Sequence, residues 1–172
     1  MQRYAEAFSF LQSKNLYTVD DLENTLHAMQ DKIDTLKKSA SSKQARIKEV
    51  DELLRMVDYY KSGKPATDKL KSIRFEKSRQ KYKAEHDDEL RTFYMAERKL
   101  KPYFKDGKLP ITAWRKERAQ LEQEYRDIQT ELSPLHADAK KLWAIHYNIY
   151  EVQHEQERQN TELRQKKQEI EH

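Results

Sequence analysis

Six histidines and ten tyrosines are the side chains of this chain best suited to metal binding or catalysis. A histidine metal site on a helix needs ligands one turn apart, but the sequence holds no His-x-x-x-His pair and no HExxH motif. His86 comes before two aspartates and is typical of a capping turn. His146 lies on an apolar helical register, where a polar residue fixes the alignment of two helices. The histidines therefore predict structural roles and no metal site.

Other catalytic motifs are also missing from the sequence. There is no cysteine, which excludes disulfides, a thiol nucleophile and thiolate-ligated zinc. Gly63 and Gly107 are the two glycines, so a glycine-rich phosphate loop and a GxSxG motif cannot form. No tyrosine stands in a motif that would activate it, and the aromatic residues near the end of the second long helix are interpreted as hydrophobic anchors: Trp143, Tyr147 and Tyr150, with Trp114 further upstream. We expect no catalytic residue, no cofactor and no enzymatic activity in this chain.

Basic residues offer the one recognisable binding chemistry. Nine basic residues stand against Asp68 and Glu76 between Lys61 and Lys83, and the aromatics Phe75, Tyr82 and Tyr94 are interleaved with the basic stretches. Such a mixture suits a phosphate backbone and base stacking. A solvated surface whose lysine stems cover apolar area accounts for the same charges, and the sequence leaves both interpretations open. The candidate nucleic-acid-binding residues are Lys69, Lys71, Arg74, Lys77, Arg79, Lys81, Lys83, Arg98, Lys99 and Lys101.

Two apolar registers predict the helices that position these residues. Their steps alternate between four and three residues, as in the a/d seam of a coiled coil. The first register is Leu22, Leu26, Met29, Ile33, Leu36, Ala40, Lys43, Ile47, Val50, Leu54 and Val57. The second register is Trp114, Arg118, Leu121, Tyr125, Ile128, Leu132, Leu135, Ala139, Leu142, His146 and Ile149.

The predicted fold is all-α: an elongated antiparallel coiled-coil hairpin with a small helical head. Leu26 and Met29 should lie near residues 142–149, and Leu54 and Val57 near residues 114–121. The segments expected are a short N-terminal helix (2–17), a first stalk helix (18–61), a basic helical head (62–108), a second stalk helix (109–154) and a charged, frayed tail (155–172).

Local signals set these boundaries. Asn15 ends the first helix in a left-handed conformation, and Thr18 caps the next. Ser62-Gly63-Lys64-Pro65 predicts the end of the first stalk helix, and Asp106-Gly107 predicts a tight turn. Pro134 predicts a kink or short break in the second stalk helix, because the residue before proline disfavours helical geometry. Within the head, Lys71, Arg74, Ser78 and Lys81 are predicted to share one helix face.

Composition agrees with a narrow core. Hydrophobic residues make up 36% and charged residues 37% of the 172 residues, against about 45–50% and 25% in a compact globule. No stretch approaches the ~20 apolar residues needed to cross a bilayer, and the N-terminus lacks a signal-peptide pattern. With no cysteine, we expect a cytoplasmic protein without membrane insertion.

Four stretches of the chain resemble, in order and spacing, the region that follows the catalytic domain in MobA/MobL-like relaxases of mobile genetic elements. They are FSFLQSKNLYTVDDLENTL, RIKEVDELLRMVDYYKSGKPATDKLK, KYKAEHDDELRTFYMAERKLK and GKLPITAWRKERAQLEQEYRDIQTEL. The resemblance covers about Phe8 to Val152 and implies a C-terminal helical region of a mobilization nuclease. Its histidine-bound metal and catalytic tyrosine belong to a domain that has no counterpart in this chain.

The resemblance therefore implies a non-catalytic accessory role in conjugative transfer of a plasmid or integrative element. The chain would bind transfer-origin DNA, or dock other relaxosome or secretion-system proteins. A structural or oligomerisation coiled coil with no nucleic-acid role is the alternative. The sequence does not give the DNA sequence preference, the identity of a protein partner or the oligomeric state.

Overall fold

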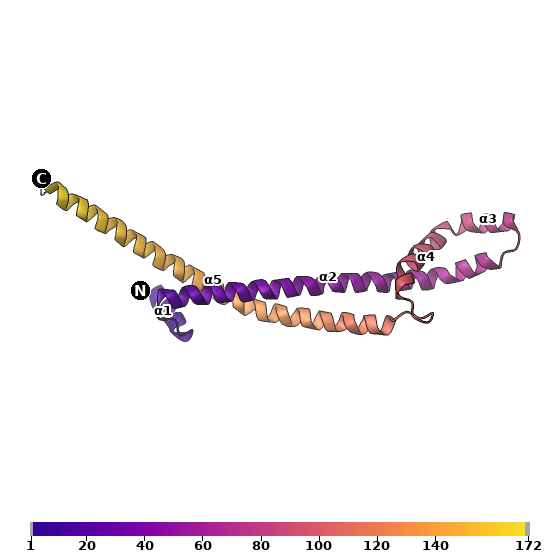
Figure 1. Cartoon of the computed structure of the whole chain (residues 1–172), viewed down its shortest axis with the longest axis horizontal. Helices are drawn as coiled ribbons and strands as arrows, with labels where there is room; N and C mark the ends of the chain where they lie inside the picture. Colours follow the sequence, from indigo (N-terminus) through magenta and orange to yellow (C-terminus); the bar gives the residue numbers. More distant parts are fainter. Residues whose placement is uncertain (1, 171–172) are drawn as a thin grey trace. The chain divides into compact units, whose positions relative to one another are not determined.

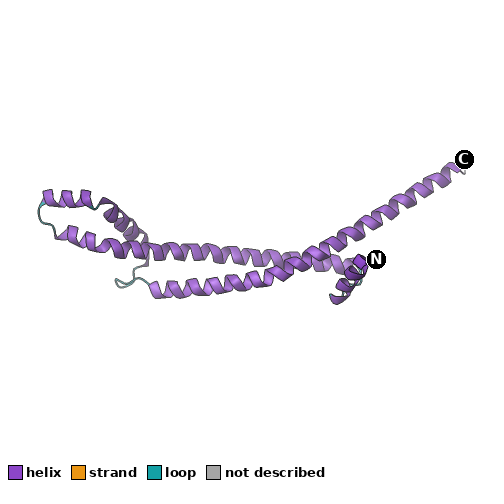
Figure 2. Ribbon diagram, turned by 180° about the vertical axis from the view of Figure 1, so that it is seen from behind, coloured by secondary structure: helices purple, strands orange, loops and turns teal. Residues whose placement is uncertain are grey.

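The computed structural model describes the backbone of residues 2–170 and the side chains of residues 5–166. These residues form helices joined by short loops, without a β-strand (Figure 2). The prediction of an all-α fold is therefore confirmed. The elements, labelled in Figure 1, are α1 (Gln2–Ser13), α2 (Val19–Ser72), α3 (Glu76–Glu85), α4 (Asp87–Leu100), the 3₁₀ helix η1 (Lys101–Tyr103) and α5 (Ile111–Ile170).

The chain divides into two compact units, and both long helices contribute to each. Unit 1 consists of Met1–Ser39 and Ile128–His172, and unit 2 of Ala40–Asp127. Every position of the two predicted registers is buried or half-buried, so the a/d seam is confirmed. The hydrophobic interior of each unit is therefore built largely from the seam residues that belong to that unit.

In unit 1, α2 and α5 pack antiparallel. Leu22 and Leu26 lie against Leu142, with Ile145 and Ile149 packed around them, and Ile33 lies against Leu132 and Ala139. Ion pairs run in the same antiparallel order: Glu23 with His146 at 2.9 Å and Lys32 with Glu131 at 2.6 Å. The expected contact of Leu26 and Met29 with residues 142–149 is confirmed. Helix α1 joins this unit through Phe10 and Leu11.

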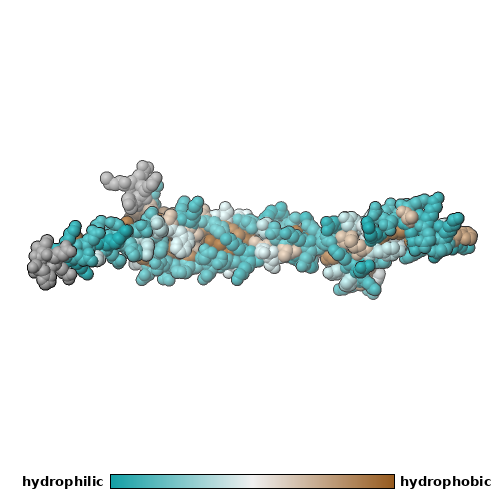
Figure 3. Space-filling model, turned by 90° about the horizontal axis from the view of Figure 1, so that it is seen from above, coloured by the Kyte–Doolittle hydropathy of each residue, from teal (hydrophilic) through white to brown (hydrophobic). Residues whose placement is uncertain are grey.

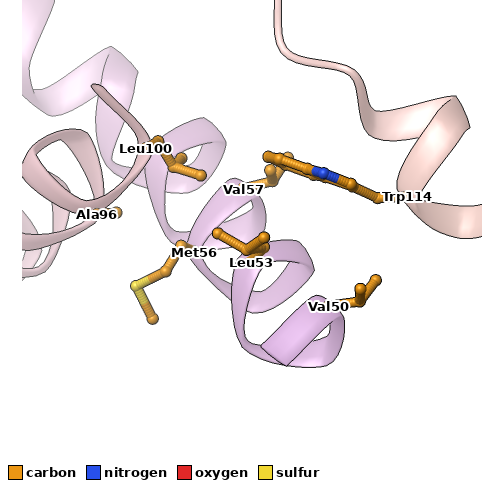
Figure 4. Packing of buried hydrophobic residues seen from close by; sticks show 7 residues of the cluster. All are labelled: Val50, Leu53, Met56, Val57, Ala96, Leu100 and Trp114. Atoms are coloured by element: carbon orange, nitrogen blue, oxygen red, sulfur yellow. The ribbon is translucent and has the colours of Figure 1, made fainter. Parts of the chain in front are cut away.

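In unit 2, α2 lies between α4 and α5. Val50, Leu53, Met56 and Val57 of α2 pack against Ala96 and Leu100 of α4 on one side and Trp114 of α5 on the other (Figure 4). Antiparallel pairing of α2 with α5 again follows from cross-helix ion pairs, here Lys43 with Glu124, Arg46 with Glu117 and Arg118 with Asp51. The expected contact of Leu54 and Val57 with Trp114 is confirmed.

Three polar residues occupy seam positions, and each has an acidic partner on the other helix. Lys43 pairs with Glu124, Arg118 with Asp51, and His146 with Glu23. Long or amphipathic side chains can leave their stems in the seam while their charged ends reach solvent. The seam therefore stays continuous through these three polar positions.

The predicted end of the first stalk helix at residues 62–65 is wrong, because α2 continues to Ser72. Gly63 is buried, and a Cβ there would meet the Phe93 Cβ at 2.6 Å, so the glycine permits a close crossing by α4. Pro65 lies on the exposed side of α2, where water can satisfy the carbonyl that loses its helical partner. The first long helix therefore ends at Ser72, and the chain turns at Ile73–Phe75.

The predictions for α5 also need correction. The helix runs unbroken through Pro134, and Ser133 before it is helical. Both residues are exposed, while Leu132 is buried and Leu135 half-buried in the seam, so packing on each side of the proline maintains the helix. The tail predicted to fray from residue 155 is instead a continuation of α5 to Ile170, and residues 155–166 of it are exposed. His172, the predicted end of that tail, lies outside the described residues.

The other local signals are confirmed. Asn15 has φ 57°, and the amide of Asp21 donates to Thr18 Oγ1 at 3.0 Å while the amide of Thr18 donates to Asp21 Oδ2 at 3.1 Å. This reciprocal pair is a capping box that satisfies two free amides at the start of α2. Asp106 and Gly107 have φ 49° and 73°, which is typical of the tight turn of a hairpin.

Candidate nucleic-acid interface

The strongest concentration of charge lies around the turn that joins α2 to α3. Between Lys69 and Lys83 there are seven basic residues and one acidic residue, Glu76. We call the seven the basic cluster: Lys69, Lys71, Arg74, Lys77, Arg79, Lys81 and Lys83. In Figure 1, α3 runs back beside the last turns of α2, so these residues come from two neighbouring helices and the loop between them.

A small core holds the two helices together beneath this charge. Ala66 and Leu70 of α2 pack against Tyr82 of α3 and Leu90 of α4. Thr67 is fully buried in α2, and its hydroxyl donates to the Gly63 carbonyl at 3.1 Å. Ala66 and Leu70, through which α2 contacts α3 and α4, are not part of the seam between α2 and α5.

Three members of the basic cluster have structural contacts. The Arg79 guanidinium donates to the Ile73 carbonyl at 2.8 Å and pairs with Glu76 at 3.5 Å, which ties α3 to the loop before it. The Lys81 ammonium lies 3.8 Å from Glu85, one turn along α3. The Lys69 ammonium lies 5.3 Å from the centre of the Tyr82 ring, a cation–π contact.

The other four members are exposed and lack an acidic partner. Within the described part of the chain, no carboxylate lies within ion-pair distance of Lys71, Arg74, Lys77 or Lys83. Unpaired cations that lie close together on a surface attract an anion. Each cation that neutralises a DNA phosphate releases a counterion from the DNA, which favours binding. We call these four the unpaired set.

The predicted single face is wrong. Lys71 belongs to α2, Arg74 to the loop and Ser78 with Lys81 to α3, because the helix breaks at Ile73–Phe75. Side chains that a continuous helix would align in one row are instead distributed around a turn. The basic side chains therefore surround the turn between α2 and α3. This arrangement suits contacts with a few neighbouring phosphates.

The aromatic residues of the head divide into buried and exposed. Tyr82 is only 9% exposed and belongs to the core, so it cannot stack on a base. Phe75 is 77% exposed and stands between Arg74 and the start of α3, where it is available for stacking. Tyr94 is partly exposed but lies on α4, away from the basic cluster in sequence.

The remaining predicted residues, Arg98, Lys99 and Lys101, lie at the end of α4 and in η1. Lys99 pairs with Glu52 of α2 at 2.8 Å, a contact that fixes α4 against α2. Arg98 and Lys101 line an open hollow of about 570 Å³ together with Tyr94, Glu97 and Phe104. Since Lys99 is engaged and Glu97 shares the hollow, this second group is a weaker anion site than the basic cluster.

Ionisable groups elsewhere serve the fold. Hydrogen bonds that Arg46 donates to the carboxylates of Glu117 and Glu49 raise the pKa of Arg46, and a hydrogen bond that Lys43 donates lowers the pKa of Glu124. Among the described residues, no group of three histidine, aspartate or glutamate side chains is arranged to hold a metal ion. No helix in the same part of the chain is both long and apolar enough to cross a membrane.

The exposed aromatic residues of α5 were not anticipated. Trp114 is buried, as predicted for a hydrophobic anchor, but Trp143, Tyr147 and Tyr150 are 46%, 61% and 50% exposed. On the face shown in Figure 3 most of the surface is hydrophilic and hydrophobic residues are visible only in limited patches. The heptad positions of these residues could have revealed their exposure, since none of the three falls on the a/d register.

Comparisons with known proteins identify no relative. No family model matches the chain, and neither a curated protein nor a solved structure is significantly similar to it. The resemblance to the accessory region of relaxases therefore stays a prediction from the four sequence stretches.

Proposed function

We propose that this chain is a non-catalytic helical region that binds the phosphate backbone of DNA through the basic cluster. The observation that carries this proposal is the unpaired set: four exposed cations around one helix–loop–helix turn, with Phe75 between them. Lysines in such an arrangement contact phosphates and do not read base edges, so binding should be largely independent of sequence.

The sequence resemblance supplies the biological setting of the proposal. In that setting the chain is the C-terminal accessory region of a DNA relaxase in the cytoplasm. It assists conjugative transfer by holding DNA near the transfer origin or by docking relaxosome and secretion-system proteins. Sequence-independent phosphate binding suits such a role, because the nuclease domain would select the nicking site.

A structural coiled coil without a nucleic-acid role is the second candidate. The observation that favours it is the long exposed part of α5 after Val152, which has no partner helix among the described residues. In this candidate the chain spaces or recruits proteins, and its basic cluster is a solvated surface.

Gel shifts with a short DNA duplex separate the two candidates. The test variant replaces Lys71, Arg74, Lys77 and Lys83 with Gln, which removes charge and retains long polar side chains. The control variant replaces four exposed lysines elsewhere with Gln: Lys37, Lys38, Lys48 and Lys116. DNA binding should be lost in the test variant and retained in the control. Equal shifts for both variants would contradict the proposed interface.

A second experiment tests the accessory role. Purified alone, the chain should neither nick nor relax supercoiled plasmid that carries a transfer origin, with any divalent metal ion, because it lacks nucleophile and ligand motifs. Metal-dependent nicking that disappears when one tyrosine is changed to Phe would show that the chain has a catalytic site of its own.

A further inference from the structure

One face of α5 in unit 1 carries a row of exposed residues at alternating steps of four and three. It lies beside the seam, and all six residues are exposed. We call it the aromatic stripe: His136, Lys140, Trp143, Tyr147, Tyr150 and His154. The steps repeat the spacing of a coiled-coil seam, but the residues occupy heptad positions that neither α1 nor α2 covers.

The chemistry of the stripe is that of a protein interface. Trp and Tyr are enriched where proteins meet, because they bury a large area at a small entropic cost. Two of the rings have ordered neighbours: the ring centres of Trp143 and His146 lie 5.7 Å apart in an edge-on contact, and Tyr150 Oη lies 2.7 Å from His154 Nε2. The stripe is thus a preorganised surface with half-exposed rings.

The stripe is complementary to itself. Its members lie at equal distances on either side of Ile145, so an antiparallel copy centred there would place matched residues opposite each other. Trp143 would face Tyr147 of the second copy, an aromatic pair. Lys140 would face Tyr150 of the second copy, a cation–π pair. Each contact would occur twice, as in an isologous two-fold interface.

The charges beside the stripe match in the same arrangement. Lys140 and Glu151 have no ion-pair partner among the described residues. They are about 16 Å apart along one helix at ~1.5 Å per residue, so they cannot pair within a chain. Between two antiparallel copies, Lys140 would lie next to Glu151 of the second copy. Ala144, next to the centre, would allow the helices to approach closely.

We propose that a second copy of this chain packs antiparallel against the aromatic stripe, with the two-fold axis at the level of Ile145 along α5 and on the side of the helix that carries Ala144. This interface is separate from the basic cluster and does not use the a/d seam, which is filled within each chain. Single-stranded nucleic acid is the other occupant that exposed aromatics suit. The neighbouring carboxylates of Glu151, Glu155 and Glu157 disfavour it.

Sedimentation equilibrium of the whole chain over a range of concentrations tests the proposal. A monomer–dimer equilibrium is expected, and Trp143→Ala with Tyr147→Ala should raise its dissociation constant at least tenfold. Tyr17→Ala is the matched control, since Tyr17 is 72% exposed in the same unit but lies outside the stripe. Circular dichroism should show unchanged helicity in both variants. A chain that remains monomeric at every concentration would overturn the proposal.

Charge exchange tests the antiparallel geometry. Lys140→Glu and Glu151→Lys should each weaken the dimer, and the double variant should restore it, because the two residues meet only between copies. Failure of the double variant to recover would contradict this pairing.

Cysteine cross-linking locates the axis, since the chain has no cysteine of its own. Ala144→Cys should form a disulfide-linked dimer, whereas Ala137→Cys should not, because residue 137 would face residue 153 of the second copy and lie far from residue 137 of that copy. Cross-linking of Ala137→Cys alone would indicate another alignment and overturn the proposal. So would a monomeric chain whose affinity for single-stranded DNA falls when Trp143 and Tyr147 are replaced with Ala.

Discussion

At the residue scale, Gly63 determines how closely α4 can cross α2. A Cβ at this position would lie 2.6 Å from the Phe93 Cβ and 3.2 Å from the Glu89 carbonyl oxygen. Neither atom is the flexible end of a side chain, so backbone would have to move. The aromatic rings of Tyr60 and Phe93 stack nearby with centroids 5.0 Å apart.

We expect Gly63→Ala to lower the free energy of unfolding by about 1–2 kcal/mol, because overpacking outweighs the better helix propensity of alanine. Thermal or denaturant unfolding followed by circular dichroism measures the change. Ser62→Ala, at an exposed position one residue earlier, should change stability by less than about 0.5 kcal/mol. If Gly63→Ala stabilised the chain, the close crossing of α2 and α4 would be wrong.

A second residue-scale prediction concerns Asp21 in the capping box. Hydrogen bonding, first of all from the Thr18 hydroxyl, lowers the pKa of Asp21 below its ordinary value of 3.8. The carboxylate therefore stabilises the fold above about pH 3.8, and this contribution is lost as the pH falls through the lowered pKa. NMR titration should show a higher pKa for Asp21 in Thr18→Ala. An unchanged value would contradict the capping box.

At the scale of elements, α3 depends on one buried side chain. It has ten residues, fewer than the roughly 12–15 that an isolated helix needs to be stable in water. Tyr82 is its buried residue, packed with Ala66, Leu70 and Leu90 and in contact with the His86 ring at 4.2 Å. The positions of Lys77 and Lys83 therefore depend on the packing of Tyr82.

Replacing Tyr82 with Ala should release α3 while the paired parts of α2 and α5 remain folded. Amide hydrogen exchange should accelerate in residues 76–85 by at least tenfold and change little at Leu26 and Leu142. Tyr82→Phe, which retains the ring, should exchange like the unmodified chain. Uniform acceleration throughout the chain would show that α3 is not a separate element of stability.

The elements also show which structural features a sequence pattern can reveal. Both registers are buried or half-buried throughout, because a/d periodicity reports directly on the face that one helix turns to another. The meaning of Gly63 depends on the position of α4, which no local pattern contains. Whether Pro65 and Pro134 are exposed likewise depends on which side of each helix is packed. Because the local sequence does not contain this information, it predicts an end or a break of the helix at each proline.

The candidate interface was predicted only in part for the same reason. The clustering of basic residues is visible in the sequence. The sequence does not show that Arg79 and Lys99 are engaged in contacts within the chain. Those contacts join residues that are six or more positions apart. The burial of Tyr82 and exposure of Phe75 also follow from tertiary packing.

At the scale of the whole molecule, the distribution of charge is more informative than its sum. The net charge is +4 for 172 residues, which by itself indicates little about a partner. Seven of the basic residues fall between Lys69 and Lys83 with a single acid. The aromatic stripe of α5 and the basic cluster belong to different compact units, so the two proposed surfaces can be altered independently.

The salt dependence of DNA binding tests the central claim most directly. Fluorescence anisotropy with a labelled duplex between about 50 and 200 mM salt gives the slope of log K against log salt. Each phosphate contact contributes about 0.9 to the magnitude of that slope, so replacing the four unpaired cations with Gln should reduce it by roughly 3–4. An unchanged slope, or no binding by the unmodified chain at low salt, would contradict a phosphate-binding role for the basic cluster.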